Sequence, residues 1–323
     1  MRIKASCLVA SLFAFSAAAQ QLPIEPKLEK LGEVGAGEGP AWLAGEGLLF
    51  SGQGRIGLWK NGKAHVYRDP AGRPNGLMID PQGRLVVCES GERRLTRTEK
   101  DGRITILADR FEGMRFNTPN DLTIDSKGRV YFSDPRYGKR EGMEMRDSHG
   151  NTVEGVYRID APGVVHRVLG REVERANGVL VSPNDEFLYV ADNNNNNAGG
   201  ARRLWRYKLR SDGSVDAASR KLVFDWGDAR GPDGVKMDRQ GRLFVAAGLN
   251  KANPPYETAE RFRGGIYVLS PDGKLLQFLP VPNDEVTNCA FGDDDLRSLY
   301  VTAGGTLFRA RLHSPGWLAG RPR

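Results

Sequence analysis

Apolar residues alternate with polar ones in the segment formed by residues 119–135, and the same arrangement recurs along the chain. In this segment Leu122 and Ile124 precede a polar turn, and Val130 and Phe132 follow it, with the alternation of a β-hairpin. The turn ends in Gly128, a residue type that readily adopts the positive φ of tight turns. The same hairpin pattern begins near residues 75, 177 and 233, and weaker copies begin near residues 38 and 288. The sequence therefore predicts six copies of one β unit.

The spacing of the copies indicates the architecture. Their first residues are Glu38, Asn75, Asn120, Asn177, Asp233 and Asn288, separated by 37, 45, 57, 56 and 55 positions. An all-β unit repeated every ~40–50 residues is typical of a propeller blade. A second pair of strand-like segments follows each hairpin, as at residues 155–159 and 164–168 after the third copy. We expect an all-β fold, a six-bladed β-propeller with four antiparallel strands per blade.

The last repeat is one strand short, because only residues 306–312 have a strand pattern after its hairpin. Residues 27–34, at the other end of the chain, have a pattern that suits the missing outer strand. Pairing the two ends would close the ring and protect two open sheet edges. We therefore predict that residues 20–323 form a single propeller domain closed by an N-terminal strand.

The first 19 residues have the features of a signal peptide. Arg2 and Lys4 precede an apolar segment at residues 6–15, and three alanines at residues 17–19 precede Gln20. We expect a periplasmic or secreted protein whose formal charge falls from +7 to +5 on cleavage. No later segment is apolar enough to span a membrane. Basic residues do not cluster with aromatics, so nucleic acid is not an expected partner, and the charge gives only weak support for acidic sugars. The oligomeric state stays open.

Two cysteines follow the predicted cleavage site, Cys88 in the second repeat and Cys289 in the sixth. Because these repeats would form separate blades, we expect no disulfide despite the oxidising compartment. Both are predicted to be small core residues.

Several other motifs carry little chemistry. The G-x-G-x-x-G match at residues 52–57 lacks the following helix that a dinucleotide site requires, and no histidine has metal-ligand spacing. The polar insertion at residues 137–154 is compatible with a lid over a site or with a surface loop. The five asparagines at residues 193–197 predict a loop whose first members face the channel.

The strongest chemical signal is the set of residues that begin the hairpins. The innermost strands of a propeller all run the same way along the channel, so their first residues meet around one mouth. Here they are two carboxylates, Glu38 and Asp233, and four amides. Oxygen ligands of this kind suit a hard cation such as Ca²⁺, Mg²⁺ or Mn²⁺. Asparagine and aspartate also favour turns, but that preference does not account for the glutamate or for all six positions.

These residues resemble the SMP-30/gluconolactonase/luciferin-regenerating-enzyme-like family. The motifs that carry the resemblance, in the family's order, are Glu38-Gly-Pro-Ala-Trp, Asn117-Thr-Pro-Asn-Asp, Tyr131-Phe-Ser-Asp-Pro, Ala176-Asn-Gly-Val and Pro232-Asp-Gly. The second motif, with Asp134-Pro-Arg-Tyr-Gly, is most similar to the bacterial gluconolactonase branch. The resemblance implies a six-bladed propeller.

The resemblance also implies roles for the site residues. One divalent cation would be held by Glu38, Asn177 and Asp233; Ca²⁺ is the first expectation, with Mg²⁺, Mn²⁺ and Zn²⁺ as alternatives. Asn120 would bind substrate and in some members also touch the metal, and Asp233 would be the general base. Some sugar-lactonase members grip their substrate with an arginine two residues before that asparagine. This chain has Thr118 there, so their sugar specificity does not transfer.

The expected activity is that of a metal-dependent lactonase. The metal would polarise the carbonyl of a sugar lactone, and Asp233 would take a proton from the attacking water. Activation of the water by the metal alone is an equally economical route. Asn120 would stabilise the developing oxyanion, while Asn75 and Asn288 would complete the substrate pocket. Two alternatives stay open: hydrolysis of other lactones or organophosphate esters at the same site, and a non-catalytic propeller that binds a ligand.

Overall fold

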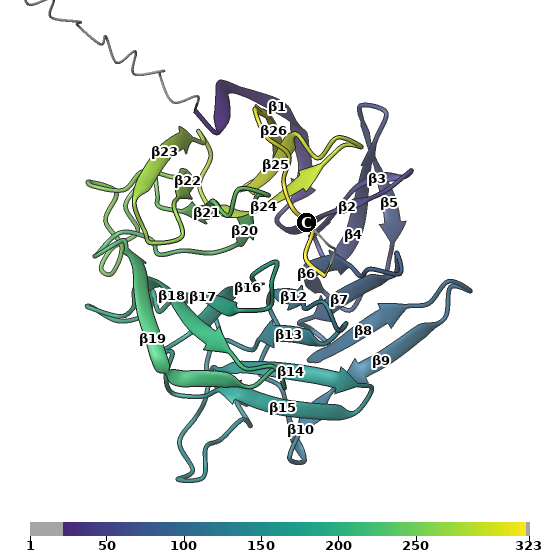
Figure 1. The fold of residues 1–323 in the computed structure, drawn as a ribbon, viewed down its shortest axis with the longest axis vertical. Helices are drawn as coiled ribbons and strands as arrows, with labels where there is room; N and C mark the ends of the chain where they lie inside the picture. The colour runs from purple at the N-terminus through teal and green to yellow at the C-terminus, as the bar shows by residue number, and fades with distance from the viewer. Residues whose placement is uncertain (1–21, 321–323) are drawn as a thin grey trace, which may run out of the picture.

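The computed structural model describes residues 22–320, which form a ring of six four-stranded antiparallel sheets around a central axis (Figure 1). This confirms the six-bladed propeller that the repeats predict. The predicted signal peptide, residues 1–19, lies outside the described residues. Among residues 22–320 there is no helix able to cross a membrane.

Each of the first three blades follows the chain order from the inner strand to the outer one. Blade one consists of β2 (Glu38–Leu43), β3 (Gly47–Gly52), β4 (Arg55–Lys60) and β5 (Lys63–Arg68). Blade two consists of β6 (Pro74–Ile79), β7 (Leu85–Glu89), β8 (Arg94–Thr98) and β9 (Ile104–Ala108). Blade three consists of β12 (Leu122–Ile124), β13 (Val130–Ser133), β14 (Val156–Ala161) and β15 (Val164–Leu169). A small hairpin of β10 (Arg110–Phe111) and β11 (Met114–Arg115) joins blades two and three.

The next two blades repeat this order, and the sixth combines both ends of the chain. Blade four consists of β16 (Ala176–Val181), β17 (Phe187–Asn193), β18 (Arg202–Leu209) and β19 (Val215–Asp225). Blade five consists of β20 (Val235–Met237), β21 (Leu243–Ala247), β22 (Gly265–Leu269) and β23 (Leu275–Pro280). Blade six consists of β24 (Val286–Gly292), β25 (Ser298–Ala303), β26 (Gly305–Leu312) and the N-terminal β1 (Ile24–Ala36).

The closure of the ring agrees with the sequence-based prediction. Strand β1 pairs antiparallel with β26, with Leu28 opposite Ala310 and Lys30 opposite Phe308. The first strand of the chain thus covers the edge that the last strand would leave open.

The inner hairpins are fastened by one recurring contact. In the third blade, Asp125 accepts hydrogen bonds from the backbone N–H groups of Lys127 and Arg129, and from Arg129 Nε at 2.6 Å. Gly128 closes the turn with a φ of 82°. The same aspartate-to-arginine contact joins Asp80 to Arg84 and Asp238 to Arg242. The repeated Asp-x-x-Gly-Arg pattern therefore has a local structural cause.

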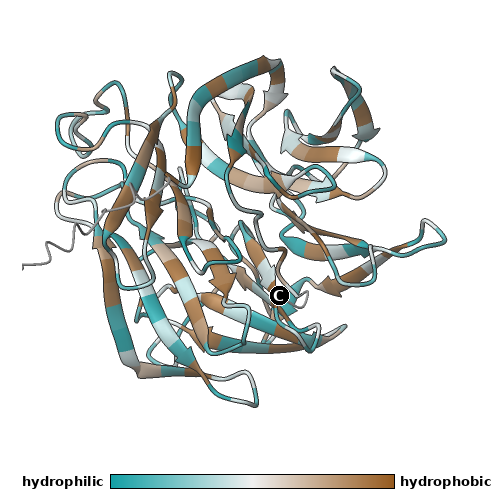
Figure 2. Ribbon diagram, turned by 45° about the horizontal axis from the view of Figure 1, so that its top comes forward, coloured by the Kyte–Doolittle hydropathy of each residue, from teal (hydrophilic) through white to brown (hydrophobic). Residues whose placement is uncertain are grey.

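Apolar side chains fill the spaces between neighbouring blades. Polar and apolar residues alternate along many strands (Figure 2), and the exposed apolar residues are mostly on the outer strands. Cys88 belongs to the core between blades two and three, whereas Cys289 belongs to the core of blades five and six. Both are buried and free, as predicted.

The C-terminal segment, residues 313–320, covers the far end of the channel and lies near the propeller axis (Figure 1). The Gly316 N–H donates to the carbonyl of Leu296, and the Trp317 N–H donates to that of Met237, the last residue of β20. Trp317 packs there with Met78 and Leu180. Access to the other mouth, where the inner strands begin, is not affected by this segment.

Candidate metal and substrate site

The six predicted residues all lie where the inner strands begin. Glu38 is the first residue of β2, and Asn75, Asn177 and Asn288 lie within the first three residues of β6, β16 and β24. Asn120 and Asp233 lie two residues before β12 and β20. The structure thus places them at one mouth of the propeller, while their chemical roles stay predictions.

The six residues form a ring around this mouth, and glycines bring neighbouring members of the ring together. Gly76 N–H donates to the carbonyl of Asn120 at 2.7 Å, and Gly178 N–H donates to that of Asp233 at 3.2 Å. A Cβ atom on Gly178 would lie 2.1 Å from the Asp233 carbonyl oxygen, and one on Gly76 would lie 2.5 Å from that of Asn120. Gly39 is similarly close to Asn75, and Gly234 to Asn288. A glycine after a ring residue therefore lets adjacent blades approach at the mouth.

Glu38 is held by donors but lies in an acidic setting. Its Oε2 atom accepts hydrogen bonds from Gly39 N–H at 2.7 Å and from Asn288 Nδ2 at 3.0 Å. Burial raises the pKa of the Glu38 carboxyl well above its usual value, and the nearby carboxylates of Asp233 and Asp121 raise it further. A bound cation would relieve this repulsion and keep Glu38 ionised.

Asp233 has a cationic partner that the sequence did not suggest. Arg230 Nη2 donates to Asp233 Oδ2 at 2.9 Å, and Arg230 Nη1 lies 3.3 Å from Glu285 Oε1. Burial raises the pKa of Asp233 to about 6, and Arg230 acts in the opposite direction. Within residues 22–320, no hydrogen bond is donated to Asp233 Oδ1. The ion pair thus orients the carboxylate and leaves one oxygen for another ligand.

Three amide oxygens of the ring have no protein donor. The Oδ1 atoms of Asn75, Asn120 and Asn177 are buried and accept no hydrogen bond from the described residues. Buried acceptors without partners are unfavourable, and a cation would satisfy them. No group of three or more His, Cys, Asp or Glu residues forms a metal site within the described chain. Any metal here would instead have mixed carboxylate and amide ligands, which suits a hard cation.

Asn288 has a different setting from the other amides. Its Nδ2 donates to Glu38, and its Oδ1 accepts from Cys289 N–H at 2.9 Å and from Lys236 Nζ at 3.2 Å. Lys236 Nζ also lies 3.7 Å from Asp121 Oδ2. Because both ends of the amide are engaged, the geometry favours orientation of Glu38 by Asn288 over the predicted contact with substrate.

The insertion at residues 137–154 brings a tyrosine to the ring. Tyr137 Oη accepts a hydrogen bond from Asn177 Nδ2 at 2.8 Å and donates to the carbonyl of Asn193 at 3.4 Å. Met143 and Met145 are buried, so the insertion is anchored to the blades. Sequence reasoning did not identify Tyr137, Arg230, Asp121 or Lys236, although Asp121 and Tyr137 lie within the motifs of the family resemblance.

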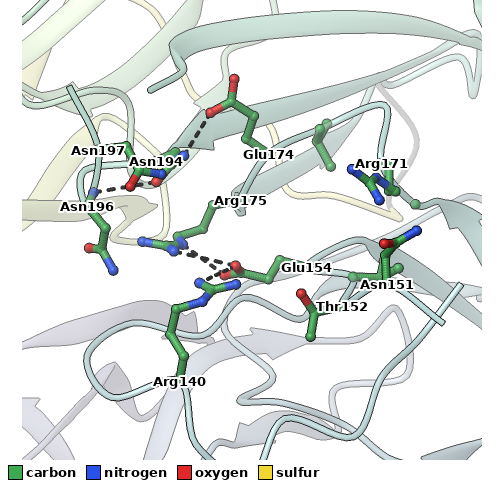
Figure 3. A pocket seen from close by; sticks show the side chains of 13 residues that line it. Arg140, Asn151, Thr152, Glu154, Arg171, Glu174, Arg175, Asn194, Asn196 and Asn197 are labelled. Atoms are coloured by element: carbon green, nitrogen blue, oxygen red, sulfur yellow. Dashed lines mark hydrogen bonds and ion pairs between the residues drawn. The ribbon is translucent and has the colours of Figure 1, made fainter. Parts of the chain in front are cut away.

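A polar cavity of about 490 Å³ lies behind the insertion. Arg140 and Arg175 converge on Glu154 there, with N–O distances of 2.5 and 2.8 Å (Figure 3). On the same wall Glu174 accepts from Asn194 Nδ2 at 2.8 Å. The positive charges that face Glu154 are therefore already paired.

The comparisons with known proteins agree with the fold and show the family to which the chain belongs. A family model described as "SMP-30/Gluconolactonase/LRE-like region" matches residues 36–305. A gluconolactonase of Zymomonas mobilis is 30% identical over 86% of this chain and 79% of its own length. A 6-deoxy-6-sulfogluconolactonase of Pseudomonas putida is 28% identical over 65% of this chain and 67% of its own. The structure of the gluconolactonase XC5397 from Xanthomonas campestris has a TM-score of 0.71 and 29% identity, covering 88% of this chain and 89% of its own.

Proposed function

Since the chain belongs to the SMP-30/gluconolactonase/LRE-like family, we propose that it is a hydrolase that opens sugar lactones with the help of one divalent cation at the ring. The observation that carries the proposal is the meeting of two carboxylates with three buried, unpartnered amide oxygens at one channel mouth. A site that only bound a neutral ligand would have no need to collect carboxylates that repel one another.

Glu38, Asn177 and Asp233 are the residues that would hold the cation, with Asn120 at its side. Their all-oxygen donor set suits Ca²⁺ first, and Mg²⁺, Mn²⁺ or Zn²⁺ as alternatives. When bound, a divalent ion supplies Lewis-acid polarisation of the lactone carbonyl.

The chain itself supplies the proton acceptor and the orienting groups. Arg230 donates to Asp233 Oδ2 and orients the carboxylate, which takes a proton from the attacking water. The pKa of Asp233, which burial raises to about 6, leaves this carboxylate ionised at neutral pH and makes it a stronger base than an exposed aspartate. Asn120 donates its amide N–H to the carbonyl oxygen as negative charge develops there.

The test is hydrolysis of glucono-δ-lactone by metal-stripped protein, before and after Ca²⁺, Mg²⁺, Mn²⁺ or Zn²⁺ is added. Glu38→Gln and Asp233→Asn are expected to lower the metal-restored kcat at least ~100-fold. Asp101→Asn, which removes an exposed charge from blade two, is the matched control and should match the wild type. Metal binding without turnover on lactones or organophosphate esters would favour a binding protein, and failure to bind any metal would overturn the proposed site.

We also infer that the protein is exported. The support is the charged, apolar and alanine-rich order of residues 1–19. N-terminal sequencing of the protein from fractionated cells tests this directly. A mature chain that begins at Gln20 in the periplasm or medium is expected, and an intact Met1 in the cytoplasm would contradict it.

A further inference from the structure

A second cavity, a cleft of about 540 Å³, lies beside the ring and shares Asn75 and Tyr137 with it. Its walls come from five places: the turn after β3, the start of β6, the turn after β7, the segment before β12, and the beginning of the insertion. A molecule whose reacting group lies over the ring would therefore extend its remaining part into this cleft.

All the charged side chains that line the cleft are basic. They are Arg73, Arg93, Arg136 and Lys139, and no aspartate or glutamate lines it. Arg93 has a carboxylate partner, Glu144, at 2.9 Å. Within residues 22–320, no carboxylate lies within 4.0 Å of the side-chain nitrogens of the other three. The Arg136 guanidinium donates only to the backbone carbonyls of Lys139 and Glu141.

The excess of basic groups without carboxylate partners does not extend to the neighbouring polar cavity around Glu154. There Arg140 and Arg175 both lie within ion-pair distance of Glu154, so each of these basic groups has a carboxylate partner (Figure 3). The two cavities are neighbours, because the guanidinium of Arg175, which lines the polar cavity, lies 5.3 Å from the centre of the ring of Tyr137, which lines the cleft. Among the basic residues that line the two cavities, those without a carboxylate partner all line the cleft.

The position of Arg73 is fixed by its surroundings. It has a φ of 52°, a backbone conformation that non-glycine residues adopt rarely. Gly91 makes room for its stem, since a Cβ atom on Gly91 would lie 2.8 Å from both Cβ and Cδ of Arg73. An energetically unfavourable backbone that places a cation at a cleft is a feature found at binding sites.

We propose that this cleft binds an anionic substituent of the substrate, so that the preferred lactones are those of acidic sugars with a carboxylate, phosphate or sulfonate away from the lactone ring. The inference rests on the proposed lactonase function and adds the substrate class to it. A hydroxyl group would gain little from three unpaired cations, whereas an oxyanion receives charge-assisted hydrogen bonds from them.

The kinetic test compares glucono-δ-lactone with its 6-phosphate and with glucaro-δ-lactone, which carries a carboxylate. The variant is the double substitution Arg73→Gln with Lys139→Gln, because both side chains are exposed and make no ion pair with the described residues. We expect the wild type to have the lower KM for one or both anionic lactones, and the double variant to raise that KM about tenfold or more. Kinetics on the neutral lactone should not change. Lys63→Gln on the outer strand β5 removes a similar charge. It should change neither the KM for the anionic lactones nor the kinetics on the neutral lactone.

A binding measurement separates this inference from the proposed function. Calorimetry with 1,5-anhydroglucitol 6-phosphate and with 1,5-anhydroglucitol uses ring ethers that cannot be opened. Tighter binding of the phosphate, lost in the double variant but kept in Lys63→Gln, would support the anion site even if no lactone were hydrolysed. Equal binding of the two ethers, or a phosphate preference that survives in the double variant, would overturn it even if glucono-δ-lactone were turned over.

Discussion

Asn177 donates its side-chain amide to the hydroxyl of Tyr137 at 2.8 Å, and this contact leaves Asn177 Oδ1 as a buried oxygen without a protein donor. The tyrosine comes from the insertion of blade three, whereas the asparagine begins the inner strand of blade four. A residue outside the repeat thus fixes which atom of a ring amide is presented to the channel.

Tyr137→Phe should weaken metal binding without unfolding the protein. Loss of the hydroxyl frees the Asn177 amide to rotate, and removal of such an orienting partner typically lowers metal affinity ~10–100-fold. Calorimetric titration of metal-stripped protein with Ca²⁺ measures the effect. Tyr256→Phe, at an exposed position, is the control and should bind like the wild type. An unchanged affinity in Tyr137→Phe would show that Asn177 is oriented by other means.

The repeat and the ring were readable from the sequence because both follow from local rules. Alternation and the Asp-x-x-Gly-Arg turn recur at several of the inner hairpins, so the repeat pattern alone puts Glu38 and Asp233 at equivalent positions. The common direction of the inner strands then places these positions at one mouth.

The partners of the ring were not readable in the same way. Arg230 and Lys236 have no basic counterparts at fixed repeat positions, and Tyr137 lies in an insertion outside the repeated hairpins. Their contacts depend on how loops from different blades fold over the mouth. The basic cleft is similar, since Arg73 and Lys139 are far apart in the chain and meet only when the propeller closes.

Gly178→Ala should destabilise the protein at the ring itself. The new Cβ atom would lie 2.1 Å from the Asp233 carbonyl oxygen, so blades four and five must separate slightly. We expect a loss of about 1–3 kcal/mol in the free energy of unfolding, measured by urea titration, together with weaker metal binding.

Gly170→Ala is the matched control for this substitution. Gly170 has an ordinary φ, and the nearest atom to its added Cβ would be 3.6 Å away. Its stability should stay within ~0.5 kcal/mol of the wild type. If both alanine variants were equally stable, the close approach of the blades at Gly178 would not be a constraint.

Asp125→Ala should show how strongly the inner hairpin depends on its aspartate. The substitution leaves Arg129, which is largely buried, and two backbone N–H groups without their acceptor. Removing one partner of such a buried pair costs about 3–5 kcal/mol in the free energy of unfolding. Asp101→Ala breaks an exposed pair with Arg103 and should leave the free energy of unfolding almost unchanged. Comparable losses in the two urea titrations would argue against a special role for the buried contact.

The two cysteines give a pH-dependent test of the core. Burial raises the pKa of the Cys88 thiol well above its usual value, and it raises that of Cys289 to about 12. Only the thiolate reacts with iodoacetamide, so a raised pKa keeps both thiols protonated and unreactive in the folded protein at pH 8. Raising the pH from 8 to 9 should therefore add little modification of the folded protein. An exposed thiol with an ordinary pKa of ~8.5 would react several times faster at pH 9 than at pH 8.

Peptide-resolved mass spectrometry measures the extent of modification at each cysteine, in buffer and in denaturing urea. In urea both thiols should react rapidly, with the pH dependence of exposed cysteines. Prompt labelling of either residue in buffer at pH 8 would mean that the interface between its blades opens locally. Because Cys88 and Cys289 lie in different interfaces, labelling of only one would identify which part of the ring opens.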